Sequence, residues 1–116
     1  YEGNNSFDLR DNPSRLYRNI NLSVRSNVRL QFYLRVTTEG DKNTFLELLV
    51  GPEGYPRSVA GKWSYVDEGD YRFVDIDLSP YPMTENFWIE FKCTGCNPYW
   101  QGGHRFNVDD VKVWAN

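Results

Sequence analysis

Alternation of hydrophobic and polar residues is the main pattern along this chain. From Val28 to Val36 every second residue is apolar, which is the period of a strand that buries one face. Residues 44–50, 74–78 and 87–91 alternate similarly, with apolar positions at Leu46, Leu48, Val50, Val74, Ile76, Leu78, Phe87, Ile89 and Phe91. No segment of ten or more residues shows helical periodicity. The pattern therefore predicts a series of antiparallel strands.

The last alternating segment contains a change of phase. Phe106 and Val108 share one parity, whereas Val111 and Val113 share the other. One extra residue in a strand is a β-bulge, and a bulge redirects the side chains beside it. The sequence therefore predicts a bulge at residues 109–110, where an aspartate could turn toward a site.

Turn-forming residues separate the alternating segments. Gly and Pro, with acidic or hydroxyl neighbours, cluster at residues 39–41, 51–54, 68–70, 79–80 and 101–103. Short strands with this punctuation predict an all-β fold, namely a two-sheet antiparallel β-sandwich (jelly roll). The chain has the length of one domain and contains no linker or repeat, so we expect residues 1–116 to form a single domain. Because it opens on Tyr1 instead of Met, we expect it to be excised from a larger secreted protein.

Composition and charge exclude several classes of partner. The net charge is −3 and the basic residues are scattered, so we do not expect a nucleic-acid binder. No apolar run reaches the roughly 18 residues of a membrane-spanning helix, so we do not expect membrane insertion either. Aromatic residues make up 16% of the chain, which is more than a core of this size needs. Some of them are therefore expected on the surface, where Tyr and Trp serve recognition.

Several aromatic residues occupy positions that the core does not require. Trp88 has the opposite parity to its buried neighbours, Tyr33 and Arg35 share an outward parity, and other aromatics lie in expected loops. Aromatic rings stack on the apolar faces of sugars, while Arg, Gln and Asn bond the hydroxyls. The candidate ligand-binding residues are Trp88, Tyr99, Trp100, Tyr33, Arg35 and Trp63. The alternative is that these rings cover sheet edges or pack against a neighbouring domain.

The sequence offers little for catalysis. Asp75 and Asp77 share one face of a strand, as a glycosidase pair could, but so do the acids of any solvated strand. His104 is the only histidine and there is no Gly-x-Ser-x-Gly motif, so no nucleophilic triad is indicated. We therefore expect a protein that is not an enzyme.

The two cysteines form a single CxxC motif, Cys93 and Cys96. A redox motif would need a following helix, which Pro98 and the Gly-rich sequence after it do not provide. A small disulfide between Cys93 and Cys96 is the preferred interpretation. A zinc site with His104 as third ligand, and a pair of free thiols, are the alternatives.

Several segments, taken in order, resemble MAM-like domains. They are Tyr1-Glu2-Gly3, Ile20-Asn21-Leu22-Ser23, the segment from Tyr71 to Tyr81, Phe87-Trp88-Ile89-Glu90-Phe91, and Val108-Asp109-Asp110-Val111. These domains are jelly-roll sandwiches similar in shape to galactose-binding modules. They occur on receptors and as accessory domains of secreted microbial proteases, glycosidases and adhesins. Animal members carry a larger set of cysteines, so the resemblance points to a microbial accessory domain.

The resemblance also implies a structural calcium ion where the first strand meets the last. Glu2 and Asp109 match the positions of its ligands, and Asn4 and Asp110 are possible further ligands. Calcium binds carboxylate, amide and carbonyl oxygens with flexible geometry. The alternative is that the two aspartates only cap the bulge.

Together these features predict a binding function. We expect an extracellular, monomeric, non-catalytic module that binds a polysaccharide or other glycan. The alternative is an accessory domain that stabilises or docks a neighbouring domain of a secreted protease or surface protein. Two glycosylation sequons, Asn4-Asn5-Ser6 and Asn21-Leu22-Ser23, matter only where the host glycosylates secreted proteins.

Overall fold

The computed structural model describes residues 10–12, 15–94 and 106–115. These residues form short strands joined by loops, with a single 3-10 turn, η1. The elements are β1 (Arg10–Asn12), β2 (Arg15–Ile20), β3 (Arg29–Val36), β4 (Phe45–Pro52), β5 (Ser58–Trp63), η1 (Tyr65–Asp67), β6 (Gly69–Asp77), β7 (Phe87–Thr94) and β8 (Phe106–Trp114). This part of the chain has no helix long and apolar enough to cross a bilayer.

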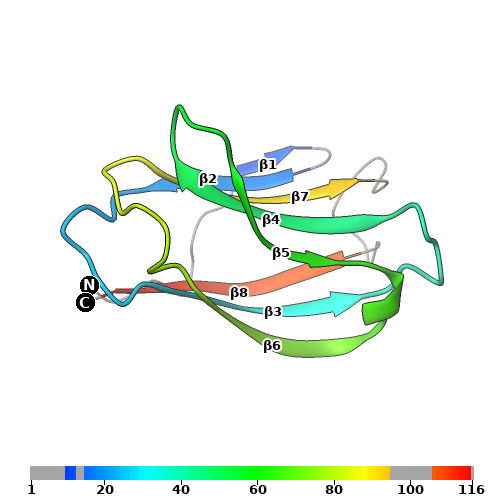
Figure 1. The fold of residues 1–116 in the computed structure, drawn as a ribbon. Helices are drawn as coiled ribbons and strands as arrows, with labels where there is room; N and C mark the ends of the chain where they lie inside the picture. The colour runs from blue at the N-terminus through cyan, green and yellow to red at the C-terminus, as the bar shows by residue number, and fades with distance from the viewer. Residues whose placement is uncertain (1–9, 13–14, 95–105, 116) are drawn as a thin grey trace.

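The strands form two antiparallel sheets that pack face to face (Figure 1). The larger sheet has the strand order β1-β2-β7-β4-β5 and the smaller has the order β6-β3-β8. β2 pairs with β7, β3 with β6 and β4 with β5, so the pairs are nested along the chain. Nested antiparallel pairs divided between two sheets are the connectivity of a jelly roll. The predicted all-β sandwich is therefore confirmed.

The predicted alternation matches the observed burial. In β3 the residues Leu30, Phe32, Leu34 and Val36 have no exposed surface, and the intervening side chains are partly or fully exposed. The inward residues of β4 and β7 are equally buried, and so is Leu78, which directly follows β6. Phe32 of the smaller sheet packs edge-on against Phe91 of the larger sheet, with ring centres 4.9 Å apart. This layer of side chains between the sheets is the hydrophobic core.

The predicted bulge lies in β8. Gln31 pairs with Lys112 and Tyr33 pairs with Asp109, so Phe32 alone faces the two residues 110 and 111. Asp110 adopts a φ of 53°, a left-handed conformation that Asp tolerates better than most residues. Because of this extra residue, Phe106 and Val113 both point into the core despite their different parity.

Trp63 belongs to the rim of the core. Its ring packs edge-on against Phe32, with ring centres 5.8 Å apart. A Cβ built on Gly61 would lie 2.5 Å from Cη2 of Trp63, so the indole lies directly over this glycine. The absence of a side chain at Gly61 is what lets the tryptophan cover the edge of the sandwich.

Gly61→Ala is therefore expected to destabilise the domain by about 1–3 kcal/mol, the usual cost of overpacking. The added methyl group would push the Trp63 ring off Phe32. Urea denaturation of the variant measures the effect. Ser58→Ala, an exposed position of the same strand, is the control and should stay within about 0.5 kcal/mol of the parent. An unchanged midpoint for Gly61→Ala would mean that the indole can move aside without cost.

Candidate functional site

The outer surface of the smaller sheet carries three exposed aromatic rings. Tyr33 of β3 is 41% exposed, and Tyr71 and Phe73 of β6 are 45% and 53% exposed. All three alternate with residues that point inward, so the pleat of the two strands directs them to solvent. We call this surface, with Arg35 beside the rings, the aromatic face.

Register brings the rings of the aromatic face together. Tyr33 and Phe73 are direct cross-strand partners, and their ring centres are 5.4 Å apart with a tilt of 58°. Next to this pair, the guanidinium carbon of Arg35 lies 5.5 Å from the centre of the Tyr71 ring. Asn107 pairs with Arg35 on the β8 side. Within the described residues no carboxylate pairs with Arg35, and its Nε is buried without a hydrogen-bond partner there.

The other end of the smaller sheet is charged and internally paired. Arg29 Nε donates to Asp75 Oδ1 at 2.9 Å, and its Nη1 lies 4.0 Å from Asp77 Oδ2. The backbone N–H of Ser79 donates to Asp77 Oδ1, which together with Arg29 lowers the pKa of Asp77. Both carboxylates are therefore bonded to neighbouring groups of the domain. This pairing favours a structural role for the two aspartates over acid catalysis.

Trp88 lies on the opposite side of the molecule, on the outer face of the larger sheet. Its outward orientation agrees with its predicted parity, but its ring is only partly exposed. Tyr17 stacks on it at 4.9 Å, the guanidinium of Arg57 lies 4.7 Å from the ring centre, and its Nε1–H donates to Glu90 at 2.8 Å. A sugar stacking on the indole would have to displace Tyr17 or Arg57.

The remaining predicted ligand-binding residues are separated from the aromatic face. Trp63 covers the core rim next to Phe32, which leaves Tyr33 and Arg35 as the predicted residues on that face. Tyr99 and Trp100 lie outside the described residues.

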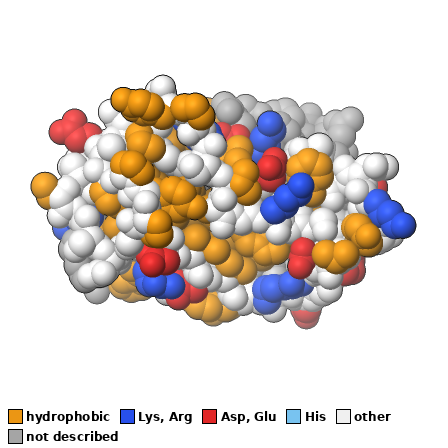
Figure 2. Space-filling view, viewed as in Figure 1, with side chains coloured by type: hydrophobic (Ala, Val, Ile, Leu, Met, Phe, Trp, Pro, Cys, Tyr) orange, Lys and Arg blue, Asp and Glu red, His pale blue; other side chains and the backbone are white. Residues whose placement is uncertain are grey.

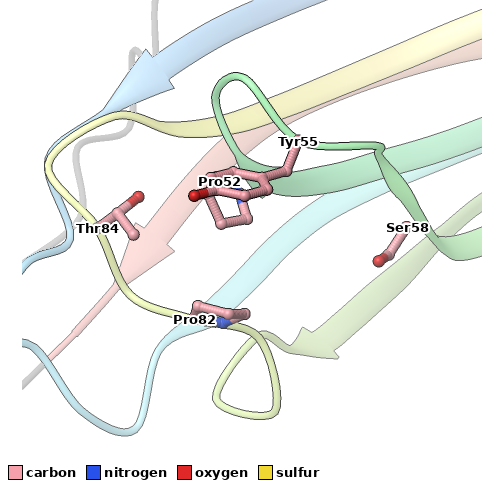
Figure 3. Close-up of a pocket in the computed structure, with 5 residues that line it drawn as sticks. All are labelled: Pro52, Tyr55, Ser58, Pro82 and Thr84. Carbon is pink, nitrogen blue, oxygen red and sulfur yellow. The ribbon is translucent and has the colours of Figure 1, made fainter.

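A pocket of about 470 Å³ lies between the β4–β5 turn and the loop that leads into β7 (Figure 3). Its lining consists of Pro52, Tyr55, Ser58, Pro82 and Thr84. Tyr55 is 68% exposed, and none of the lining residues is charged. Hydrophobic side chains gather on the half of the surface that carries this turn (Figure 2). The pocket is a second surface able to take a neutral ligand.

The expected calcium ligands are only partly described. Asp109 and Asp110 are exposed, and Asp109 Oδ1 accepts the backbone N–H of Asp110 at 2.8 Å, which caps the bulge. Carboxylate oxygens suit calcium, but Lys112 Nζ is 3.7 Å from Asp110 Oδ2 and opposes a cation there. Asp109 is therefore the better donor. Among the described residues no group of three His, Cys, Asp or Glu side chains could hold a metal. Glu2 and Asn4 lie outside them, so the calcium site stays a prediction.

Only one of the two cysteines of the CxxC motif lies within the described residues. Cys93 is 2% exposed near the end of β7, and Cys96 lies outside the described residues. The disulfide stays a prediction.

Tyr71 and Phe73 were not among the candidates from sequence. The signal was present, because both share their parity with Asp75 and Asp77 and oppose the partly buried Val74 and Ile76. Alternation thus marks them as outward, but only the register of β3 against β6 places them beside Tyr33 and Arg35.

Comparison with known proteins adds little to this description. No family model matches the chain, and no curated protein matches it. A solved structure that resembles it is the crystal structure of a cyclase from Fischerella sp. TAU, with 15% identity and a TM-score of 0.42. The match covers 89% of this chain and 57% of the cyclase chain. A TM-score this low supports no inference about fold or activity.

Proposed function

We propose that this chain is a non-catalytic carbohydrate-binding domain and that its aromatic face binds the sugar. The observation that carries the proposal is the pair of exposed rings, Tyr33 and Phe73, held side by side on adjacent strands. A rigid sheet keeps these rings in place without a ligand, so little conformational entropy is lost on binding.

The polar residues around the rings support the same ligand class. Arg35 lies next to Tyr71, and Gln31 of β3 and Asp109 of β8 are the polar neighbours of Tyr33, whereas Oδ1 of Asn107 is buried. A sugar presents apolar ring faces and many hydroxyls, which matches aromatic rings bordered by a guanidinium, an amide and a carboxylate. An extracellular location and a role as an accessory domain of a secreted microbial protein belong to this proposal, as the resemblance to MAM-like domains implies.

Alanine substitution on the aromatic face tests the proposal. Tyr33→Ala and Phe73→Ala should each weaken glycan binding at least tenfold, which corresponds to about 1.4 kcal/mol. Loss of a cross-strand aromatic pair costs only about 0.2–1 kcal/mol of stability, so the melting temperature should change little. Pull-down on insoluble polysaccharides followed by titration of soluble fragments gives the affinities.

Tyr55→Ala is the matched control, because Tyr55 is also an exposed aromatic residue but lines the pocket instead of the aromatic face. Normal binding by this variant together with weak binding by the other two supports the proposal. The reverse result would move the sugar site to the pocket. Retention on no glycan would instead favour the alternative, in which the exposed rings dock a neighbouring domain.

We also propose a structural calcium ion bound through Asp109, with Glu2, Asn4 and Asp110 as the other candidate ligands that the resemblance implies. The support is the exposed carboxylate of Asp109 beside the bulge. Because Asp109 is the direct cross-strand partner of Tyr33, the ion would lie beside the aromatic face.

A further inference from the structure

A sequon lies in the loop that joins β2 to β3. Asn21 and Ser23 flank Leu22, which has no exposed surface and whose backbone N–H donates to the carbonyl oxygen of Thr84 at 2.8 Å. The buried leucine thus anchors the loop to its neighbour, while Asn21 remains exposed. The acceptor residue therefore lies on the surface of an ordered loop.

The side chains of the sequon already contact each other. Asn21 Oδ1 accepts the backbone N–H of Ser23 at 3.0 Å and the Ser23 hydroxyl at 2.7 Å. Within the described part of the chain, no hydrogen bond engages Asn21 Nδ2. The nitrogen that receives a sugar is thus unengaged, and the hydroxyl that the motif requires contacts the same amide group.

Asn12 provides an internal contrast. Asn12-Pro13-Ser14 has Asn and Ser at the same spacing, but Pro in the middle position excludes it as an acceptor. Of the sequences that qualify, Asn4-Asn5-Ser6 lies outside the described residues. Asn21 is therefore the acceptor for which the structure supplies both exposure and local geometry.

We propose that Asn21 is an acceptor of an N-linked glycan when the domain is secreted by a host that glycosylates its secreted proteins. The modification rests on the proposed extracellular location and is independent of sugar binding by the aromatic face. Asn21 Nδ2 attacks the anomeric carbon of a lipid-linked oligosaccharide pyrophosphate. The new bond joins Nδ2 to that carbon, the bond from the carbon to the pyrophosphate oxygen breaks, and the lipid pyrophosphate leaves with the electron pair. Nδ2 loses one proton to a basic group of the glycosylating enzyme, which takes it on to solvent.

The glycan would not compete with the aromatic face. The loop from β2 to β3 lies at the end of the sandwich where β3 begins (Figure 1). Tyr71 and Arg35 lie near the opposite end of that strand, because Val36 pairs with Gly69. Enzymatic removal of the glycan should therefore leave the affinity for an added polysaccharide unchanged.

Peptide mapping by mass spectrometry tests the proposal on the domain secreted by a eukaryotic host. A sequon in an added C-terminal tag reports whether the glycosylation machinery acted on the protein. We expect a glycan on the peptide that contains Asn21, its loss in Asn21→Gln and Ser23→Ala, and its retention in Ser23→Thr. Melting curves of the variants verify that they are folded. A modified tag with an unmodified Asn21 in the parent protein would overturn the proposal, whatever the outcome of the polysaccharide binding assays.

Discussion

Replacing Phe32 with alanine is expected to destabilise the domain by about 3–5 kcal/mol, the usual cost of removing a buried aromatic ring. Phe32 has no exposed surface, and its ring contacts Phe91 and Trp63 of the opposite sheet. The substitution would leave a cavity between the two sheets, at the place where Phe32 packs against the opposite sheet. Because small domains are stable by only about 5–15 kcal/mol, much of the total would be lost.

Urea denaturation measures this effect, and Phe73→Ala is the matched control. Both substitutions remove a phenyl ring from a strand of the smaller sheet, but Phe73 is 53% exposed. The control should therefore lose much less stability than Phe32→Ala. Similar losses at the two positions would contradict the assignment of inner and outer faces to this sheet.

Calcium is expected to stabilise the domain by about 2.7 kcal/mol at a hundredfold excess over its dissociation constant, since a ligand that binds only the native state shifts the folding equilibrium. Melting curves are recorded with calcium and with chelator, on protein that was first unfolded in chelator to remove tightly held ion. The melting temperature should be clearly higher with calcium.

Asp109→Asn should remove the response to calcium. Asparagine keeps an oxygen that can accept the backbone N–H of Asp110, so the bulge itself should persist. Asp75→Asn is the control, because Asp75 is engaged by Arg29 on another part of the sheet and should leave the calcium response intact. Identical melting curves of the parent protein in calcium and in chelator would refute the proposed ion, whereas a calcium response retained in both variants would place the ion elsewhere.

Alternation in the sequence predicted which side chains of the binding surface point outward, but it did not predict which of them lie side by side. The outward positions of Tyr33, Arg35 and Trp88 followed from alternation within their own strands. The neighbours of these side chains could not be predicted from alternation, because Tyr17 and Arg57 contact Trp88 from segments distant in sequence. Register likewise brings Phe73 to Tyr33. Alternation reports the face on which a side chain lies, but it carries no information about its cross-strand neighbours.

Three strands, β1, β2 and β5, had no clear signal in the sequence, and the causes can be named for the two longer ones. β2 has Arg18 among its core-facing positions, opposite Ile89, and this interrupts the alternation. β5 contains Gly61 and small side chains, and its register against β4 shifts between Leu48 and Leu49. Both lie beside longer apolar strands and pair with them through the backbone. Pairing with a strong neighbour can form a strand whose own pattern is weak.

The division between sequence and tertiary structure follows from the range of the interactions. Period-2 alternation and turn residues act locally, so the sequence alone predicted the all-β class, the core-facing residues of β3, β4, β6 and β7, and the bulge at residues 109–110. The sheet order, the clustering of rings on the aromatic face and the packing of Trp63 against Phe32 all depend on contacts between strands far apart along the chain. Such contacts arise only when the two sheets close on a common core, because a strand cannot bury its apolar face alone.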